Sequence, residues 1–419
     1  MEPGQPCSVG PCSVGDVGPG FIRPLGAGEH FFHLYAQIWP VHFCLCAEID
    51  GWVRPDTLRT ATNQVRKRHP ALRVRIVDDA LSGAAFYRCD APLPLETVAV
   101  GNDADWPRTV ERELKKPMPS GVGALLRLTA VYAPETTAII LTFHHAIADG
   151  MSGVCVLRDL MRALAGERLQ ALPFSPAIEE KLLGFSAVHA DTCGRIMPVT
   201  PAVPAACEDL RPQIVTAEFS QEETARLLKR CRANETTVHG AICAAASRHL
   251  PASEQDTVRM VSPIDLRKIA GIEDDACGVF IGVHSAEVAS GGTGSIWHDA
   301  CQIAQGLPQS RSPETAREFM RRMSAEFPPT ARSEKLRAFF SAGPQSSLVV
   351  SNLGALPIAE RYGPYAVRAV WGPAMLTNLP ADRQTLGVST FAGRLRFVHQ
   401  SYSPIEGLAS EIKETLLAA

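Results

Sequence analysis

The sequence predicts an α/β (α+β) protein built from two lobes, and three observations lead to this prediction. The chain has 419 residues, a length that favours two domains over one. Strand-type and helix-type apolar patterns both occur in each half of the chain. A Pro-rich stretch without either pattern separates the halves. We therefore expect a flexible tail over 1–20, an N-terminal lobe over 21–170, a linker over 171–212 and a C-terminal lobe over 213–419.

The elements of the first half follow from its apolar runs. The opening tandem repeat PCSVG-PCSVG has no apolar periodicity, which predicts the flexible tail. A strand is then expected over 33–49, and Pro55 opens a helix that ends at Pro70. The segments that follow are expected to be strands over 72–78, 84–89, 124–132 and 136–143, with a helix over 105–116. The last of these strands is apolar almost throughout, which is typical of a strand in the middle of a sheet.

The second half starts with an expected strand over 214–219. Ser220 and Glu223 form a capping box for the next helix, and Thr236 or Thr237 caps the one after it. The remaining elements are expected to be strands over 257–264, 277–288, 346–352, 365–371, 385–391 and 394–400, and helices over 295–306, 313–326 and 331–341. Ser403 is expected to open the final helix with a second capping box.

Composition excludes several classes of function. The net charge is −3 and the chain lacks the basic excess of a nucleic-acid-binding protein. No run of about 18 apolar residues occurs, so we expect no membrane span. No apolar signal-peptide core precedes Arg23, so the twelve cysteines are expected to be reduced thiols in the cytoplasm. Cys44 and Cys46 share one face of a strand and lack further ligands at suitable spacing, which favours buried thiols over a metal site.

The stretch with the clearest chemical meaning is His-His-Ala-Ile-Ala-Asp-Gly at 144–150, between a buried strand and a helix. Attack of a hydroxyl on a thioester needs a base near neutral pH, and an imidazole with a pKa of about 6.5 suits that task. Such a base contributes roughly 10²–10⁴-fold in rate. Gly150 allows a close approach of the backbone to a ligand, and N–H groups at the helix start can stabilise an oxyanion.

A structural role for this stretch is the alternative. The spacing HxxxD is a weak pattern, because Asp149 or Ser152 can simply cap the following helix. Two histidines after a buried strand can also be core residues. Among the 12 histidines, however, only His145 has an aspartate four positions later. Residue spacing alone leaves both interpretations open.

Several segments resemble one known superfamily. The segment 144–150 matches the HHxxxDG motif of the condensation-domain superfamily, which includes peptide condensation domains, chloramphenicol acetyltransferase-like enzymes and stand-alone polyketide-associated acyltransferases. SPIDLR at 262–267 resembles the P-x-D-L-R segment of the stand-alone group, and SNLG at 351–354 resembles its S-N-x-G strand end. RHPALR at 68–73 fits the N-terminal pattern. The closest resemblance is to the phthiocerol dimycocerosyl transferase type, and no DFGWG box of plant BAHD enzymes occurs, which leaves use of CoA open.

The resemblance implies a fold and a set of roles. Two chloramphenicol-acetyltransferase-like lobes are expected to form a V, with an active-site tunnel at their interface. His145 matches the catalytic base, and Asp149 matches a structural aspartate whose arginine partner corresponds to Arg267. Gly150 matches the glycine beside the pantetheine channel, and His144 matches a supporting residue. Neither a metal nor a bound cofactor is implied.

Further expectations concern substrates and partners. Ser351 and Asn352 match positions that line the family's site. The donor is expected to be a phosphopantetheine thioester, on an acyl carrier protein or as acyl-CoA, and the acceptor a small alcohol or amine bound by a monomer. A basic cluster on two predicted helices can dock an acidic carrier or be a solvated surface: Arg317, Arg321, Arg322, Arg332, Lys335 and Arg337.

Three hypotheses about function follow from these observations. The first is an O-acyltransferase that makes esters in lipid or polyketide metabolism. The second is an amide-forming condensation enzyme of the nonribosomal-peptide type. The third is a non-catalytic module that binds carrier proteins, and the intact motif argues against it because docking alone needs no base.

Overall fold

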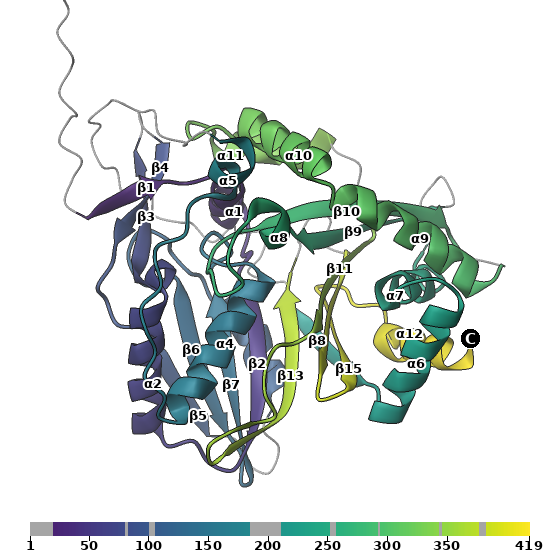
Figure 1. Ribbon diagram of the computed structural model, residues 1–419, viewed down its shortest axis with the longest axis horizontal. Coiled ribbons are helices and arrows are strands. Elements are labelled where there is room, and N and C mark those ends of the chain that lie inside the picture. Colours follow the sequence, from purple (N-terminus) through teal and green to yellow (C-terminus); the bar gives the residue numbers. More distant parts are fainter. Residues whose placement is uncertain are drawn as a thin grey trace, which may run out of the picture.

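The computed structural model of the chain describes residues 20–79, 83–99, 105–184, 211–251, 257–291, 294–342, 346–376 and 383–419. These residues form two lobes that lie side by side, each a six-stranded sheet with helices packed on it (Figure 1). The predicted two-lobed α/β architecture is therefore confirmed. The expected tail over 1–20 lies outside the described residues except for Gly20, and so does the part of the expected linker over 185–210.

The sheet of the N-terminal lobe has the strand order β12-β13-β2-β7-β6-β5. Its strands are β12 (Arg361–Tyr362), β13 (Tyr365–Met375), β2 (Phe43–Asp50), β7 (Thr136–Phe143), β6 (Leu126–Tyr132) and β5 (Leu95–Ala99). The apolar strand β7 pairs with both β2 and β6, as its sequence predicted. It therefore lies inside the sheet, and the loop that follows it leaves from the centre of the lobe.

Side chains of β2 alternate between two cores. Phe43 and Leu45 pack with helices α2 (Pro55–Arg68) and α4 (Gly150–Leu164) on one face of the sheet. Cys44 and Cys46 pack with α1 (Ala27–Ile38) and α3 (Trp106–Lys115) on the other. Both cysteines are free and buried, which confirms their interpretation as core thiols.

One prediction for this lobe was wrong. Residues 33–38 belong to helix α1 and not to a strand. Leu34 and Ile38 are four positions apart, a spacing that fits one face of a helix as well as one face of a strand. Pro40 ends this region, and β2 starts only at Phe43. A separate three-stranded sheet joins β1 (Phe21–Pro24), β4 (Gly83–Arg88) and β3 (Val74–Asp79), and a short 3₁₀ helix spans Pro70–Arg73.

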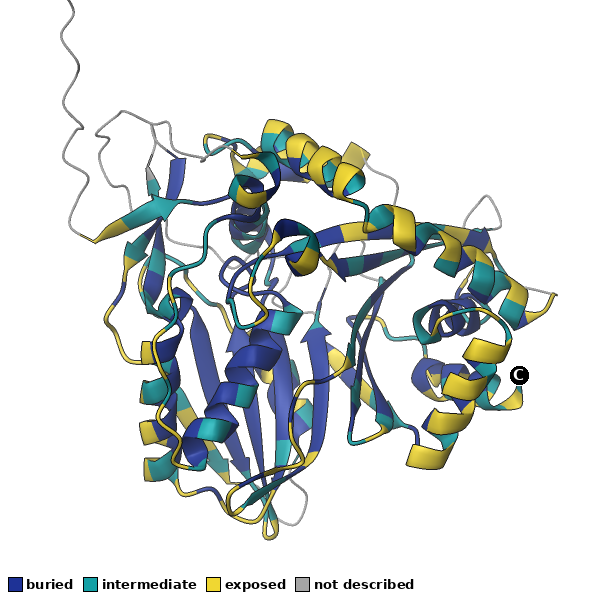
Figure 2. Ribbon diagram, viewed as in Figure 1, coloured by how far each residue is buried: buried dark blue, intermediate teal, exposed yellow. Residues whose placement is uncertain are grey.

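The sheet of the C-terminal lobe has the order β10-β9-β11-β14-β15-β8. Its strands are β8 (Gln213–Glu218), β9 (Thr257–Asp265), β10 (Ile281–Ala289), β11 (Leu348–Ala355), β14 (Gln384–Phe391) and β15 (Arg394–Ser401). One core on this sheet contains residues from the helices α6 (Gln221–Ala233), α7 (Val238–Ser247), α9 (Ile296–Ser310) and α12 (Leu408–Ala418). Figure 2 shows mixed colours along the edge strands β8 and β10, dark blue on inner helix faces, and yellow on the outer turns of the helices.

The helix starts of this lobe test the capping predictions. The box between Ser220 and Glu223 is present at α6, and the Thr237 side chain caps α7. The second predicted box is wrong, because α12 begins at Leu408 after Gly407 in a left-handed conformation with φ +75°. The N–H of Ile405 donates to the side chain of Gln384, and residues 403–407 precede the helix, with a turn at 406–407.

The two halves of the sequence do not coincide with the two sheets. β12 and β13, at 361–375, complete the sheet of the N-terminal lobe, where β13 pairs antiparallel with β2. A Cβ atom on Gly387 of β14 would collide with the carbonyl of Pro373 in β13. This close approach shows how tightly the crossing strand lies against the C-terminal sheet.

Four more helices lie between and above the sheets (Figure 1): α5 (Ile178–Leu183), α8 (Arg267–Ala270), α10 (Pro313–Glu326) and α11 (Ser333–Ala342). Helix α5 falls inside the expected linker. The basic cluster lies on and beside α10 and α11, where Arg321 and Arg322 pair with Glu318 and Lys335 pairs with Glu326. Within the described ranges, no helix has the length and hydropathy needed to cross a membrane.

Candidate active site

His145 lies in the loop between the central strand β7 and helix α4. The loop is held by its backbone, because the N–H of His144 donates to the carbonyl of Leu125, just before β6, at 2.9 Å, and the N–H of Ile147 donates to the carbonyl of His144 at 3.1 Å. A buried strand end and a short hydrogen-bonded turn therefore fix the imidazole in place.

The imidazole of His145 packs between aromatic side chains. Its ring stacks on that of Phe32 in α1, with 3.7 Å between centroids, and lies 5.1 Å from the ring of Phe43 in β2. His145 is only 6% exposed, and its buried Nδ1 has no hydrogen-bond partner among the described residues. Burial lowers the pKa of His145 to about 4, against smaller raising effects from its own carbonyl and from Asp149. The ring is therefore neutral at pH 7, and Nε2 is the nitrogen left to face a substrate.

His144 points into the N-terminal lobe. Its Nδ1 accepts a hydrogen bond from the N–H of Ala146 at 3.2 Å, while Nε2 is buried without a partner among the described residues. Burial, together with nearby His33 and His42, lowers the pKa of His144 well below its ordinary value. This placement fits the supporting role expected from the resemblance.

Asp149 and Arg267 form a buried ion pair across the two halves of the chain. Arg267 Nη2 donates to Asp149 Oδ1 at 2.8 Å, and the N–H groups of Ser152 and Phe280 donate to the same carboxylate. Arg267 also donates to the hydroxyl of Ser152 and to Asp265. Burial alone raises the pKa of Asp149, but the charge and hydrogen bond of Arg267 outweigh it, so the net pKa is lowered.

The carboxylate of Asp149 therefore accepts hydrogen bonds from backbone N–H groups and not from the imidazole of His145. It caps helix α4 through the N–H of Ser152, so the structural interpretation of this residue also holds. We call Asp149, Ser152, Arg267 and Phe280 the inner tie. It joins the start of α4 to the β9–β10 connection, and so fixes the loop that carries His145.

Gly150 and the β11 residues meet across the lobe interface. A Cβ atom on Gly150 would lie 2.6 Å from Leu353 Cδ2, so a larger residue there would displace this side chain. Ser351 and Asn352 line the same cavity as His145 and Gly150. Asn352 Oδ1 accepts from the N–H of Gly354 at 2.8 Å, which leaves its amide nitrogen available to the cavity.

Two cavities of different character share His145 as a lining residue. The more polar of the two, called the polar cavity, has about 380 Å³ and some apolar walls, such as Phe43, Leu307 and Leu353. Its other lining groups come from both lobes: His145, Asp149, Gly150, Thr237, His239, Ser262, Asp265, Arg267, Arg311, Ser351 and Asn352. The apolar cavity, of about 370 Å³, is lined mainly by aromatic and Met side chains: Phe31, Phe32, Tyr35, Phe319, Met320, Met323, Phe339 and Phe340. Pro263, Ile281 and Met375 also line both. The cavities therefore meet at the imidazole.

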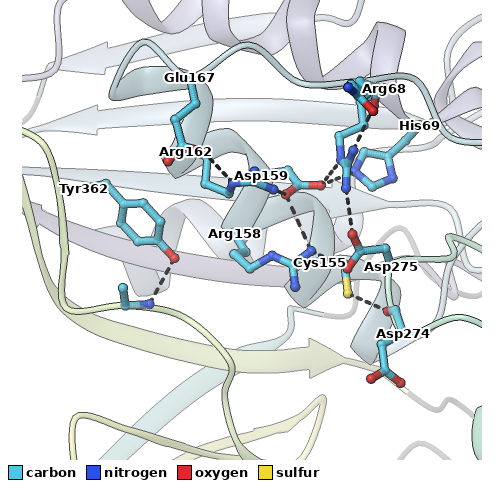
Figure 3. A network of polar contacts seen from close by, with 12 residues as sticks. Arg68, His69, Cys155, Arg158, Asp159, Arg162, Glu167, Asp274, Asp275 and Tyr362 are labelled. Atoms are coloured by element: carbon cyan, nitrogen blue, oxygen red, sulfur yellow. Dashed lines mark hydrogen bonds and ion pairs between the residues drawn. The ribbon is translucent and has the colours of Figure 1, made fainter.

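A second polar network joins the middle of α4 to the same β9–β10 connection (Figure 3). Asp159 of α4 is fully buried, pairs with Arg68 of α2 and accepts from His69 at 3.0 Å. Asp275 accepts from Arg68 at 2.7 Å and from Arg158 at 2.6 Å, and its side chain is 37% exposed. We call Arg68, Arg158, Asp159 and Asp275 the outer tie.

The described residues contain no group of three or more His, Cys, Asp or Glu side chains placed to hold a metal ion.

Two family models match this chain, one in each half. The model described as condensation domain matches residues 35–179. The model described as phthiocerol/phthiodiolone dimycocerosyl transferase C-terminus matches residues 208–397. The chain belongs to the condensation-domain superfamily. The resemblance to the dimycocerosyl transferase type, inferred from motifs alone, is thereby confirmed.

Solved structures of this superfamily share the whole fold. Polyketide synthase associated protein 5 from Mycobacterium tuberculosis is 17% identical, with a TM-score of 0.66 over 95% of this chain and 98% of that one. Trichothecene 15-O-acetyltransferase from Fusarium sporotrichioides is 12% identical, with a TM-score of 0.69 over 94% and 95%. At these identities the likeness establishes the fold alone.

Sequence relatives include very long synthetases. Malformin synthetase from Aspergillus neoniger is 29% identical over 155 residues, which are 35% of this chain and 3% of the synthetase. The chain thus spans a small part of the length of the relatives that it matches.

The structure brings all seven residues singled out from the sequence into one region, and it adds residues that the sequence did not indicate. His145, Asp149, Gly150, Arg267, Ser351 and Asn352 line the polar cavity, and His144 lies behind it. Phe32 and Phe43 were missed because apolar residues in a helix or strand look like ordinary core. His239 was missed because the sequence holds no sign that α7 starts at this cavity.

Proposed function

We propose that the protein is an acyltransferase that moves an acyl group from a phosphopantetheine thioester to a hydroxyl or amine, with His145 as general base. The observation that carries this proposal is the place of His145 between the polar and the apolar cavity. Two substrates that enter from different sides can meet at one neutral imidazole nitrogen.

The reaction balances with one base and no covalent enzyme intermediate. Nε2 of His145 takes the proton of the acceptor hydroxyl or amine as its oxygen or nitrogen attacks the thioester carbonyl carbon. Gly150 and Met151, the first two residues of α4, line the same cavity, and their backbone N–H groups would stabilise the oxyanion. The tetrahedral intermediate then expels the thiolate, which receives the proton from the imidazolium.

The two cavities suggest how the substrates divide. The apolar cavity suits the hydrocarbon part of an acyl group, because its walls offer aromatic and Met side chains. The polar cavity suits the acceptor. The donor thioester is carried by an acyl carrier protein or by CoA, and its thiol is a substrate and not a resident cofactor.

Ester formation and amide formation remain two outcomes of the same chemistry. The match to the dimycocerosyl transferase model over 208–397 favours an ester product. The match to the condensation-domain model over 35–179 and the likeness to malformin synthetase favour an amide. We propose ester formation because the dimycocerosyl transferase model matches the longer part of the chain, residues 208–397 against 35–179.

Product analysis tests this assignment. Purified protein is incubated with an octanoyl thioester of N-acetylcysteamine and with either 1-octanol or octylamine, and the products are identified by mass spectrometry. We expect ester with the wild-type chain and none above background with His145→Ala. Amide without ester would establish the condensation alternative, and equal turnover by His145→Ala would establish a non-catalytic role for the motif.

A further inference from the structure

A second imidazole lines the polar cavity, and the proposed mechanism does not use it. His239 is the second residue of α7, in the C-terminal lobe. Its Nε2 lies 3.0 Å from the hydroxyl oxygen of Ser262 on β9 and 3.6 Å from the sulfur of Cys243, one turn along α7. Two hydrogen-bond donors therefore converge on one ring nitrogen.

These contacts favour one tautomer of His239. Burial raises the pKa of the Cys243 thiol to about 12, so the sulfur keeps its hydrogen at neutral pH. When Nε2 accepts from the Ser262 hydroxyl, the ring hydrogen lies on Nδ1. Within the described residues, no protein atom accepts from Nδ1. The ring thus offers one N–H donor toward the cavity.

The charges of the polar cavity leave one cation free beside this donor. Asp149 and Asp265 both pair with Arg267. Arg311 follows helix α9 and is exposed at the cavity, and in the described part of the chain no carboxylate lies within ion-pair distance of it. Its charge acts on His239, whose pKa is lowered mainly by burial and further by His284 and Arg311. A guanidinium and a neutral N–H donor together favour an anionic oxygen.

We propose that Arg311 and His239 bind a carboxylate on the acyl acceptor, so that the preferred acceptor is a hydroxy acid or amino acid. This inference rests on the proposed function, because it assigns the apolar cavity to the acyl group and leaves the polar cavity to the acceptor. Ser262 acts as a positioning residue, since its hydroxyl, 3.0 Å from Nε2, orients the ring of His239. The alternative anion for Arg311 and His239 is a phosphate group of the donor.

A pair of acceptors that differ only in the carboxylate distinguishes an acceptor carboxylate from a donor phosphate. We would compare kcat/KM for 3-hydroxyoctanoate and for its methyl ester, with the N-acetylcysteamine thioester, which has no phosphate, as donor. The wild-type chain is expected to prefer the acid, and Arg311→Gln is expected to lower the acid-to-ester ratio about 10-fold to 100-fold. His239→Leu should lower the same ratio, and His239→Asn should restore part of it because its amide N–H lies near the position of Nδ1.

The controls make the result decisive. Arg322→Gln removes an exposed arginine of α10 outside both cavities and should leave the acid-to-ester ratio unchanged. An unchanged ratio in Arg311→Gln, with a raised KM for octanoyl-CoA, would overturn the proposal and assign the arginine to the donor phosphates. Calorimetric binding of 3-hydroxyoctanoate needs no turnover. Weaker binding to Arg311→Gln would therefore support the carboxylate site even if no acyl transfer is found, and equal binding would contradict it.

Discussion

The inner tie and the outer tie join the same two parts of the molecule, helix α4 and the β9–β10 connection, but in different surroundings. In the inner tie the side chains of Asp149 and Arg267 are 1% and 2% exposed. In the outer tie the shared carboxylate of Asp275 is 37% exposed. Water can replace a lost partner of Asp275 in the outer tie, but it cannot replace a lost partner of Asp149 or Arg267 in the inner tie. Two ion pairs that join the same elements therefore differ in the stability lost when one partner is removed, because that loss depends on how deeply the pair is buried.

Removal of Arg267 should have the largest effect. Arg267→Met leaves the buried carboxylate of Asp149 with two backbone N–H donors and no cation. We expect a loss of about 3–5 kcal/mol in the free energy of unfolding and a fall in turnover, because the His145 loop loses its anchor. Urea denaturation and kcat/KM measure the two losses.

The double variant Asp149→Asn, Arg267→Met sharpens this prediction. It removes both charges, so its free energy of unfolding should fall by less than the sum of the two single losses. Additive losses, or well-folded single variants with normal activity, would refute the anchoring role of the inner tie.

Removal of the Asp275 charge should cost less. Asp275→Asn weakens two hydrogen bonds at a partly exposed site while the buried pair of Arg68 and Asp159 remains. We expect about 1 kcal/mol or less, and a smaller loss at high salt than at low salt. A loss as large as that of Arg267→Met would break the distinction between the ties.

Acidification to pH 5 should have the smallest effect on activity. His145 stays neutral until the pH approaches its pKa of about 4, and Asp149 stays ionised because its pKa is below the ordinary value. The imidazole of His145 and the carboxylate of Asp149 therefore keep their protonation states from pH 7 to pH 5. Initial rates of kcat/KM across this range, with circular dichroism to verify folding, should be flat. A fall centred near pH 6.5 would show an imidazole with an unshifted pKa.

The fold was predictable where local patterns and packing agree. The apolar strand β7 and the capping boxes at Ser220 and Thr237 are local signals, and the structure has them. Helix α1 was missed, and its residues 33–38 were predicted as strand, because helical and extended spacing give the same apolar positions at Leu34 and Ile38. The strands β1 and β5 and helix α5 were not predicted, since each is four to six residues long and carries little periodicity.

The candidate site was predictable only where a motif exists. Asp149 and Arg267 are 118 positions apart, and resemblance to a family paired them. The Phe32 stack on His145 and the convergence of Ser262 and Cys243 on His239 arise from tertiary packing, which no local pattern encodes. The crossing of β13 into the N-terminal sheet is also a long-range event, because β2 is more than 300 residues away in sequence.

Replacement of the His145 imidazole tests the central claim most directly. His145→Ala removes the base and opens a space between Phe32 and Phe43, while the inner tie stays intact. We predict that kcat/KM for acyl transfer falls roughly 10²–10⁴-fold in protein that circular dichroism shows to be folded, and that added imidazole restores part of the rate. His298→Ala, in the surface of α9, should be silent. Undiminished acyl transfer by folded His145→Ala would contradict the account.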